Sequence, residues 1–390
     1  MADDKIIGSL SGITASEWNN LVEAGNPFMR YEFLRALEDT ACTGQQTGWI
    51  PCHAIARNAT GMTGALAAYL RSDSYGEYIF DWAWANAYEQ AGLAYYPKIT
   101  VAAPFTPATG NRILRTAREG NSLNETGPKL ITDLEDFAVK AGASGIHFLC
   151  LTREEQKFLS DVGYLPRITH QYHWLNRNFS NFDDYLDGLR AHRRKEIRRE
   201  RRKVDELGLR IELLTGSQIR EQHMRAMFAF YLQTYSRKWG SPYLNMACFL
   251  ELWKTMADSI VLILASDGDE IVAGSIAFRA HDRLFGRYWG ASAHYPYLHF
   301  ELCFYRLIEY AITEKISLFE AGAQGEHKFQ RGFTAMPVFS SHKLFHPQGA
   351  GAIAQFLSRE RRATLRALRA YRKASPNKQE AAYIPELDDL

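Results

Sequence analysis

The order of strand-like and helix-like segments repeats along the chain, and this repeat limits the possible folds more than any single motif. In the first half, the strand-like KIIGSL precedes two helical segments, SEWNNLVEAG and RYEFLRALEDTA. Further strands, a helix and a last strand follow. In the second half, LRIELLT is followed by two helices, a three-stranded meander, an amphipathic helix and the strand ISLFEAG. Both halves have the order β-α-α-β-β-β-α-β, which predicts an internally duplicated α/β (α+β) fold with a mixed sheet in each half.

The chain has 390 residues, which is long enough for two or three domains. Apolar residues make up 46% and charged residues 23% of the sequence, as is typical of globular proteins with large cores. A charged segment separates the two halves. We expect an N-terminal domain at 1–180, a basic connecting helix at 181–208, a C-terminal domain at 209–350, and a basic helix and tail at 351–390.

The five cysteines are widely spaced, odd in number and without a C-x-x-C pair. This pattern favours reduced thiols and argues against a zinc finger or a disulfide scaffold. No segment has the length of a charge-free membrane span, and the N-terminus MADDKIIGSL lacks the basic start of a signal peptide. These features predict a soluble cytoplasmic protein.

The segment FEAGAQGEHKFQRGF, residues 319–333, combines three glycines with acidic, basic and histidine side chains. Its spacing does not match the phosphate loop G-x-x-x-x-G-K-[ST], so nucleotide hydrolysis is not expected. A metal site would need scattered ligands, because no H-x-x-x-H or E-x-x-H helical pair occurs here, and we expect no metal. Two interpretations stay open: a catalytic corner, or a glycine turn whose charged side chains pair at the surface.

Several long blocks resemble a known family. They include NPFMRYEFLRALEDT, SYGEYIFDWAWANAYEQAG, YYPKITVAAPFTPATGNR, RRKEIRRERRKV, LHFELCFYRLIEYAI and FEAGAQGEHKFQRGF. They are similar to blocks of the FemAB-like N-acyltransferases, which are related to the Fem peptidoglycan aminoacyltransferases. The resemblance implies two tandem GNAT-like domains with a cleft between them. It also implies no tightly bound cofactor, with aminoacyl-tRNA or acyl-CoA as the co-substrate.

The resemblance gives the segment at 319–333 a specific role. In the Fem family a Phe-Lys-x-x-Phe-like segment at this place carries a lysine implicated near the reacting carbonyl, and here that lysine is Lys328. Acyl transfer to an amine needs a positive charge at the developing oxyanion and a group that accepts a proton. The resemblance thus implies Lys328 for the charge and Glu326 or His327 for the base. The chain departs from the pattern in having His327 where the family has phenylalanine.

A second segment, VAAPFTPATGNRILR, lies where a GNAT domain binds the pyrophosphate of its acyl-CoA donor. It keeps one glycine of the usual motif and adds an arginine. Loop amides and an arginine could bind an anion. The residues that the resemblance implies for the donor phosphate are Thr109, Gly110, Asn111 and Arg112. The alternative is a loop ordered by its prolines.

A third candidate is the basic segment RAHRRKEIRRERRK, residues 190–203, with nine Lys and Arg against two Glu. At 3.6 residues per helical turn these charges cannot share one face. Such a helix could bind the phosphates of tRNA or of another anion. We expect this of Arg194, Lys195, Arg198 and Arg199. The alternative is a solvated helix between domains.

Large rings with polar neighbours are frequent in the resembling blocks. They could line the implied cleft and orient a peptide or amino-sugar substrate, although core packing is the usual place of any one of them. The expected substrate-binding residues are Asp81, Trp84, Tyr96, Lys98, Lys238, Trp239, Arg287, Tyr288, Trp289, His299, Glu301 and Arg331.

Together these features predict an N-acyltransferase that moves an acyl or aminoacyl group to an amine acceptor. The acceptor would be a small-molecule or peptide-like amine, such as a cell-envelope (peptidoglycan) precursor, and the donor aminoacyl-tRNA or acyl-CoA. The alternative is a catalytically degenerate pair of domains that binds such a precursor or tRNA.

Overall fold

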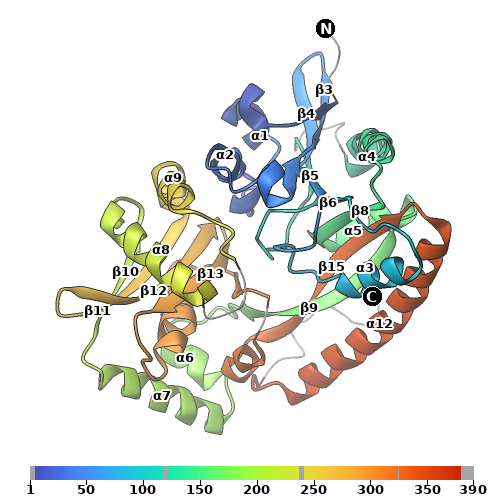
Figure 1. Cartoon of the computed structure of the whole chain (residues 1–390). Helices are drawn as coiled ribbons and strands as arrows, with labels where there is room; N and C mark the ends of the chain where they lie inside the picture. Colours follow the sequence, from blue (N-terminus) through green and yellow to red (C-terminus); the bar gives the residue numbers. More distant parts are fainter. Residues whose placement is uncertain (1–4, 117–121, 237–240, 324, 379–390) are drawn as a thin grey trace. The chain divides into compact units, whose positions relative to one another are not determined.

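The computed structural model describes residues 5–116, 122–236, 241–323 and 325–378 (Figure 1). The chain divides into two compact units. Unit 1 consists of Met1–Thr169 and Val338–Thr364, and unit 2 of His170–Pro337 and Leu365–Leu390. Strands β9 (Leu165–Leu175) and β15 (Thr334–Leu344) and helix α12 (Pro347–Ala374) each have residues in both units. Neither unit is therefore one continuous segment of the chain.

Unit 1 contains a mixed sheet with the order β15-β8-β6-β5-β2. β6 and β8 are parallel, and the other neighbours are antiparallel. The further strands of this sheet are β2 (Trp49–Pro51), β5 (Ala68–Arg71), β6 (Lys98–Val101) and β8 (Gly145–Leu151). An antiparallel sheet has the order β1-β3-β4-β7. Its strands are β1 (Ile6–Ile7), β3 (His53–Asn58), β4 (Gly61–Leu66) and β7 (Ile113–Arg115).

The helices of unit 1 precede, connect or follow these strands. They are α1 (Ala15–Asn19), α2 (Tyr31–Asp39), α3 (Trp82–Gln90), α4 (Leu123–Lys140), α5 (Arg153–Asp161) and the first part of α12. Helix α4 lies against β3 and β4. Gly64 allows this close approach, because a Cβ atom there would lie 2.3 Å from Cγ2 of Thr126. A single glycine thus determines how closely α4 packs on the sheet.

Unit 2 contains a sheet with the order β10-β11-β12-β13-β14-β9. β13 and β14 are parallel, and the remaining pairs are antiparallel, so this sheet is also mixed. Its further strands are β10 (Arg210–Thr215), β11 (Ile260–Asp267), β12 (Glu270–Ala280), β13 (Arg283–Ala291) and β14 (Leu318–Glu320). The helices are α6 (Phe182–Asp187), α7 (Ala191–Asp205), α8 (Glu221–Ser236), α9 (Met246–Met256), α10 (Leu298–Phe300), α11 (Arg306–Thr313) and the last part of α12.

The apolar run of β11 reflects helices on both faces of this sheet. Val261 and Ile263 pack in one core with residues of α6, α7 and α11. α8 lies against β12 and β13, and Figure 1 shows α8 and α9 together on the face opposite α6 and α7. A strand covered on both faces needs apolar side chains in both directions. This explains why residues 260–266 are all buried.

The second half has the predicted element order from β10 to β14, with β15 as a further strand, whereas the first half has more strands and helices than the predicted order. The expected connecting helix at 181–208 is instead two helices, because α6 ends at Asp187 and α7 begins after Arg190. Residues 338–350, which the sequence assigned to the C-terminal domain, cluster with unit 1 because β15 pairs with β8. The predicted domain boundaries and the cleft between the domains stay predictions.

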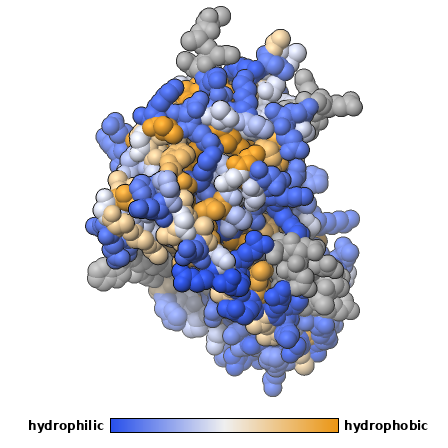
Figure 2. All heavy atoms as spheres, turned by 90° about the vertical axis from the view of Figure 1, so that its right-hand side faces the viewer, coloured by the Kyte–Doolittle hydropathy of each residue, from blue (hydrophilic) through white to orange (hydrophobic). Residues whose placement is uncertain are grey.

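The surface is largely polar where Figure 2 shows it. Apolar residues there form small patches among hydrophilic ones. Within the described parts of the chain, no helix combines the length and the apolar character that crossing a membrane would need.

Candidate functional site

A short 3₁₀ turn, Glu326–Arg331, follows β14 and carries the residues that the sequence singled out. It begins after Gly325, whose φ is 115°, and ends at Gly332, whose φ is 80°. A Cβ atom on Gly325 would lie 2.5 Å from the imidazole of His327. Glycine is therefore needed at this position both for the backbone angle and for the close approach of the ring.

Lys328 lies inside unit 2. Its side chain is buried, with the residue 4% exposed, and its Nζ donates to the carbonyl oxygen of Gly322 at 2.8 Å. No carboxylate of a described residue forms an ion pair with it. Burial lowers the pKa of Lys328 to about 8, and only the nearby Cys303 opposes this shift. A buried ammonium group without a counterion favours an anionic ligand or an oxyanion that forms during a reaction.

His327 lies among rings and stays neutral at pH 7. Its imidazole centroid is 5.7 Å from those of His299, Phe300 and Phe304. Its Nε2 has no hydrogen-bond partner among the described residues. Burial, and then the charges of Lys328 and Arg331, lower its pKa. A neutral imidazole with an unoccupied ring nitrogen can accept a proton.

Glu326, the other predicted base, is exposed. Its Oε1 accepts a hydrogen bond of 3.3 Å from the hydroxyl of Tyr371. Of the three predicted catalytic residues, the structure thus buries Lys328, half-buries His327 and leaves Glu326 at the surface of unit 2.

Arg331 fixes the turn to the core. Its guanidinium lies 3.4 Å from the ring centroid of Phe300 and donates to Glu200 at 2.6 Å and to the Tyr305 hydroxyl at 2.9 Å. It also donates to the carbonyl of His327 at 2.9 Å. These contacts make Arg331 a positioning residue for the turn, whereas the sequence assigned it to substrate binding.

The predicted residues of β13 and the following helix differ in their surroundings. His299 lies beside the turn, 5.7 Å from His327 between ring centroids, and Trp289 lies 5.1 Å from His299. Tyr288 packs on Tyr231, and Arg287 stacks on Tyr288. Glu301 is buried and pairs with Arg201 and Arg306. Lys238 and Trp239 lie outside the described residues.

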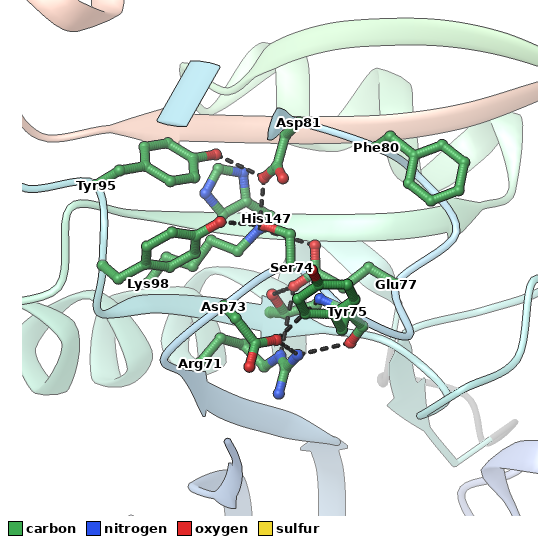
Figure 3. A network of polar contacts seen from close by, with 12 residues as sticks. Arg71, Asp73, Ser74, Tyr75, Glu77, Phe80, Asp81, Tyr95, Lys98 and His147 are labelled. Carbon is green, nitrogen blue, oxygen red and sulfur yellow. Dashed lines mark hydrogen bonds and ion pairs between the residues drawn. The ribbon is translucent and has the colours of Figure 1, made fainter. Parts of the chain in front are cut away.

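Unit 1 contains a second buried charged group, centred on Lys98 (Figure 3). Lys98 is fully buried, and its Nζ donates to Glu77 at 2.8 Å, to Ser74 at 2.9 Å and to Asp81. The Tyr95 hydroxyl donates to Asp81 at 2.6 Å. Burial works against the charge on Lys98, but Glu77 and Asp81 outweigh it and raise its pKa. Two carboxylates thus compensate the positive charge of Lys98, whereas no carboxylate of a described residue pairs with Lys328.

Part of this group was predicted from the sequence. It singled out Asp81, Tyr96 and Lys98, and the structure brings them together, with the Tyr96 hydroxyl 2.7 Å from Oγ of Ser74. Trp84 is buried beside this group, with its ring 4.8 Å from that of His342. The sequence missed Glu77, which lies within the block SYGEYIFDW and could have been chosen as a carboxylate near Asp81.

The predicted donor-phosphate loop does not present its arginine. Arg112 is fully buried, and its guanidinium donates to the carbonyl oxygens of Leu149, Ala108, Gly110 and Asn111. A phosphate would have to displace these bonds. The role that the sequence implied for Arg112 stays a prediction. Gly110 is buried in the same loop, the Asn111 amide donates to Glu23, and Thr109 is half-buried.

The basic segment has a buried face as well as a charged one. Ile197, Glu200 and Val204 point into the core of unit 2 from α7. Lys195, Arg198 and Arg199 are exposed, and Arg194 is half-buried, donating to the carbonyl of Leu189 at 3.0 Å. Anion binding by the exposed cations stays a prediction.

Comparison with known proteins gives a family match and a shared fold. A family model described as FemAB-like, peptidoglycan biosynthesis/recognition, matches residues 9–379. No curated protein sequence matches the chain. The solved structure of FemX is 9% identical, has a TM-score of 0.53, and the match covers 88% of this chain and 98% of that one.

Two further solved structures are similar. One is the C-terminal domain of a protein from Agrobacterium fabrum provisionally named lysylphosphatidylglycerol synthetase, at 9% identity and a TM-score of 0.54, covering 87% of this chain and 94% of that one. The other is a tandem GNAT protein from the clavulanic acid biosynthesis pathway, at 11% identity and a TM-score of 0.43, covering 88% and 98%. The predicted mixed α/β fold is confirmed, and with the family match over nearly its whole length the chain belongs to the FemAB-like family.

Proposed function

We propose that this protein is an N-acyltransferase that moves an acyl or aminoacyl group from a carrier to an amine. The FemAB-like family and the fold shared with FemX support this class of reaction. The observation that carries the proposal is the buried ammonium group of Lys328, which forms no ion pair with a described residue. The donor would be aminoacyl-tRNA or acyl-CoA, and the acceptor an amine of a peptidoglycan precursor.

The chemistry follows from the two side chains of the turn. The acceptor amine attacks the donor carbonyl, and the resulting oxyanion lies against the Lys328 ammonium. His327 takes the proton that the amine loses, and returns it to the departing oxygen or sulfur of the carrier. In a buried site the charge of Lys328 acts more strongly on the oxyanion than it would in water.

Replacing Lys328 with methionine should lower kcat by about 100- to 1,000-fold, the usual effect of removing one oxyanion donor. The measurement is transfer of radiolabel to an amine acceptor from each of two donors, labelled acetyl-CoA and labelled aminoacyl-tRNA. A muramyl pentapeptide nucleotide and free diamines would serve as acceptors. The exposed Lys254 provides the matched control, Lys254→Met, which should keep wild-type turnover.

The unfolding temperature of Lys328→Met distinguishes a loss of catalysis from a loss of folding. Unfolded lysine titrates near 10.5, and folded Lys328 at about 8, so the buried ammonium opposes folding at neutral pH. Lys328→Met should therefore unfold at the same or a higher temperature than the wild type. Unchanged turnover in this variant would overturn the proposal, as would a wild-type protein that binds acceptor and donor without transfer.

Turnover should depend on pH as a bell-shaped curve. Its acid limb comes from protonation of His327, whose pKa lies below the ordinary 6.5, and its alkaline limb from deprotonation of Lys328 at about pH 8. Lys328→Arg should abolish the alkaline limb, because a guanidinium stays protonated up to about pH 12. Initial rates between pH 5 and 10 test this, and an alkaline limb that persists in the arginine variant would assign it to another group.

A further inference from the structure

Three large aromatic side chains are exposed within one short segment of unit 1. Tyr75, Phe80 and Trp82 are 62%, 41% and 46% exposed. The rings of Phe80 and Trp82 are stacked with centroids 4.7 Å apart, and Tyr75 lies 6.0 Å from Trp82. Rings of this size are normally buried, and a group of them at the surface marks a binding site.

Two of these rings border an open pocket of about 450 Å³. This volume is in the range of small-molecule sites. The pocket is lined by Tyr75, Trp82, Ala85, Asn86, Glu89, Leu93, Tyr95 and Tyr96. Four of the eight lining residues are aromatic, one carries a carboxylate, and none is a lysine or an arginine.

Polar contacts of their hydroxyl groups fix Tyr95 and Tyr96, which line the pocket. The Tyr95 hydroxyl donates to Asp81 (Figure 3). The Tyr96 hydroxyl lies 2.7 Å from Oγ of Ser74. Lys98 lies 5.4 Å and 5.9 Å from the centroids of the two rings. The two rings are therefore fixed before a ligand arrives, which reduces the entropy lost on binding.

The charges around the pocket favour a cation. The charge of Lys98 is compensated by Glu77 and Asp81, so it does not repel a second positive group at full strength. Glu89 is exposed at the pocket and forms no ion pair among the described residues. Aromatic faces attract ammonium groups, and a nearby carboxylate adds to this attraction.

From these observations we infer that the pocket binds a ligand through an ammonium group, primary or methylated, placed between the Tyr75 and Trp82 rings and Glu89. The pocket lies within unit 1 and Lys328 within unit 2, so the inference stands or falls separately from the proposed acyl transfer. A neutral ring that stacks on the aromatic residues, such as a sugar, is the competing occupant.

Fluorine NMR of the full chain labelled with 5-fluorotryptophan tests the inference. The protein has eight tryptophans, and the signal that disappears in Trp82→Phe belongs to Trp82. Choline and 1,5-diaminopentane should shift this signal in a saturable way, and the Trp253 signal in unit 2 should not move. 3,3-Dimethylbutan-1-ol has the shape of choline without its charge, and should bind at least about tenfold more weakly.

Variants assign the binding to the named groups. Trp82→Leu should weaken choline binding about tenfold, while Trp82→Phe should retain most of it, because phenylalanine keeps an aromatic face. For Trp82 variants the signals of the ligand itself report binding. Glu89→Gln should weaken it several-fold, and Glu154→Gln, an exposed carboxylate on α5, should not. These side chains are exposed, so the variants should fold as the wild type does.

Two results would overturn the inference. The first is equal binding of choline and its neutral analogue, which would leave shape alone as the cause. The second is a Trp82 shift with N-acetylglucosamine but none with choline or 1,5-diaminopentane, which would assign the pocket to a neutral sugar. Choline selected over 1,5-diaminopentane would support a methylated ligand, and the reverse order a primary amine.

Discussion

Replacing Lys98 with methionine should lower the free energy of unfolding of unit 1 by roughly 3–5 kcal/mol, the usual cost of removing one partner of a buried ion pair. Lys98 is fully buried and donates to Glu77, Asp81 and Ser74. Without it, two buried carboxyl groups lose their cation. The loss of the cation affects Asp81 more than Glu77, because Lys98 outweighs the effect of burial on Asp81 and lowers the Asp81 pKa below its ordinary value.

Hydrogen exchange of β6 and β8 peptides, read by mass spectrometry, would report this loss for unit 1 alone. The matched control is Lys343→Met, which breaks a partly exposed pair with Glu135 and should cost at most about 1 kcal/mol. Adding Glu77→Gln and Asp81→Asn to Lys98→Met should recover much of the stability. If the β6 and β8 peptides of Lys98→Met exchanged as slowly as those of the wild type, Lys98 would not stabilise unit 1 through these contacts.

Replacing Arg331 with methionine should cost a similar amount in unit 2, roughly 3–5 kcal/mol. Glu200 is 2% exposed, and the change would leave it without its 2.6 Å partner. The Tyr305 hydroxyl and the His327 carbonyl would each lose a donor, and Phe300 its stacked guanidinium. The turn that carries Lys328 would lose its attachment to the core.

Exchange of peptides covering α7 and the turn measures this effect. The control is Arg225→Met, which removes an exposed pair with Glu221 and should change stability by less than about 1 kcal/mol. A double change, Arg331→Met with Glu200→Leu, should be less destabilising than Arg331→Met alone, because no charge stays buried. If the single variant matched Arg225→Met, Arg331 would not fix the turn.

The pattern of apolar and polar residues predicted most of the fold, because within each strand and helix it reflects which side chains are buried. The continuous apolar run of β11 and the amphipathic α11 are examples. The pairing of β8 with β15 could not be predicted in the same way. His147 and His342 are 195 residues apart, yet their Nδ1 atoms lie 2.8 Å from each other. Such pairing depends on the tertiary arrangement and leaves no mark in the pattern of either strand.

Asp81, Tyr96 and Lys98 were singled out because they lie in the blocks that resemble the family and combine large rings with polar neighbours. Glu200 was not, because it stands in a run of cations and its partner Arg331 follows 131 residues later. Its spacing from Ile197 and Val204, three and four residues, is the one signal that it belongs to the buried face of α7.

The two-segment composition of unit 1 has a consequence for protein synthesis. β8 is buried between β6 and β15, but β15 is made almost 200 residues later. At typical elongation speeds of about 5–20 residues per second, the ribosome needs on the order of 10–40 s to reach it. During that time one edge of β8 has no strand beside it. The nascent chain must keep this edge from pairing with other chains, so unit 1 is completed only when most of unit 2 has already been made.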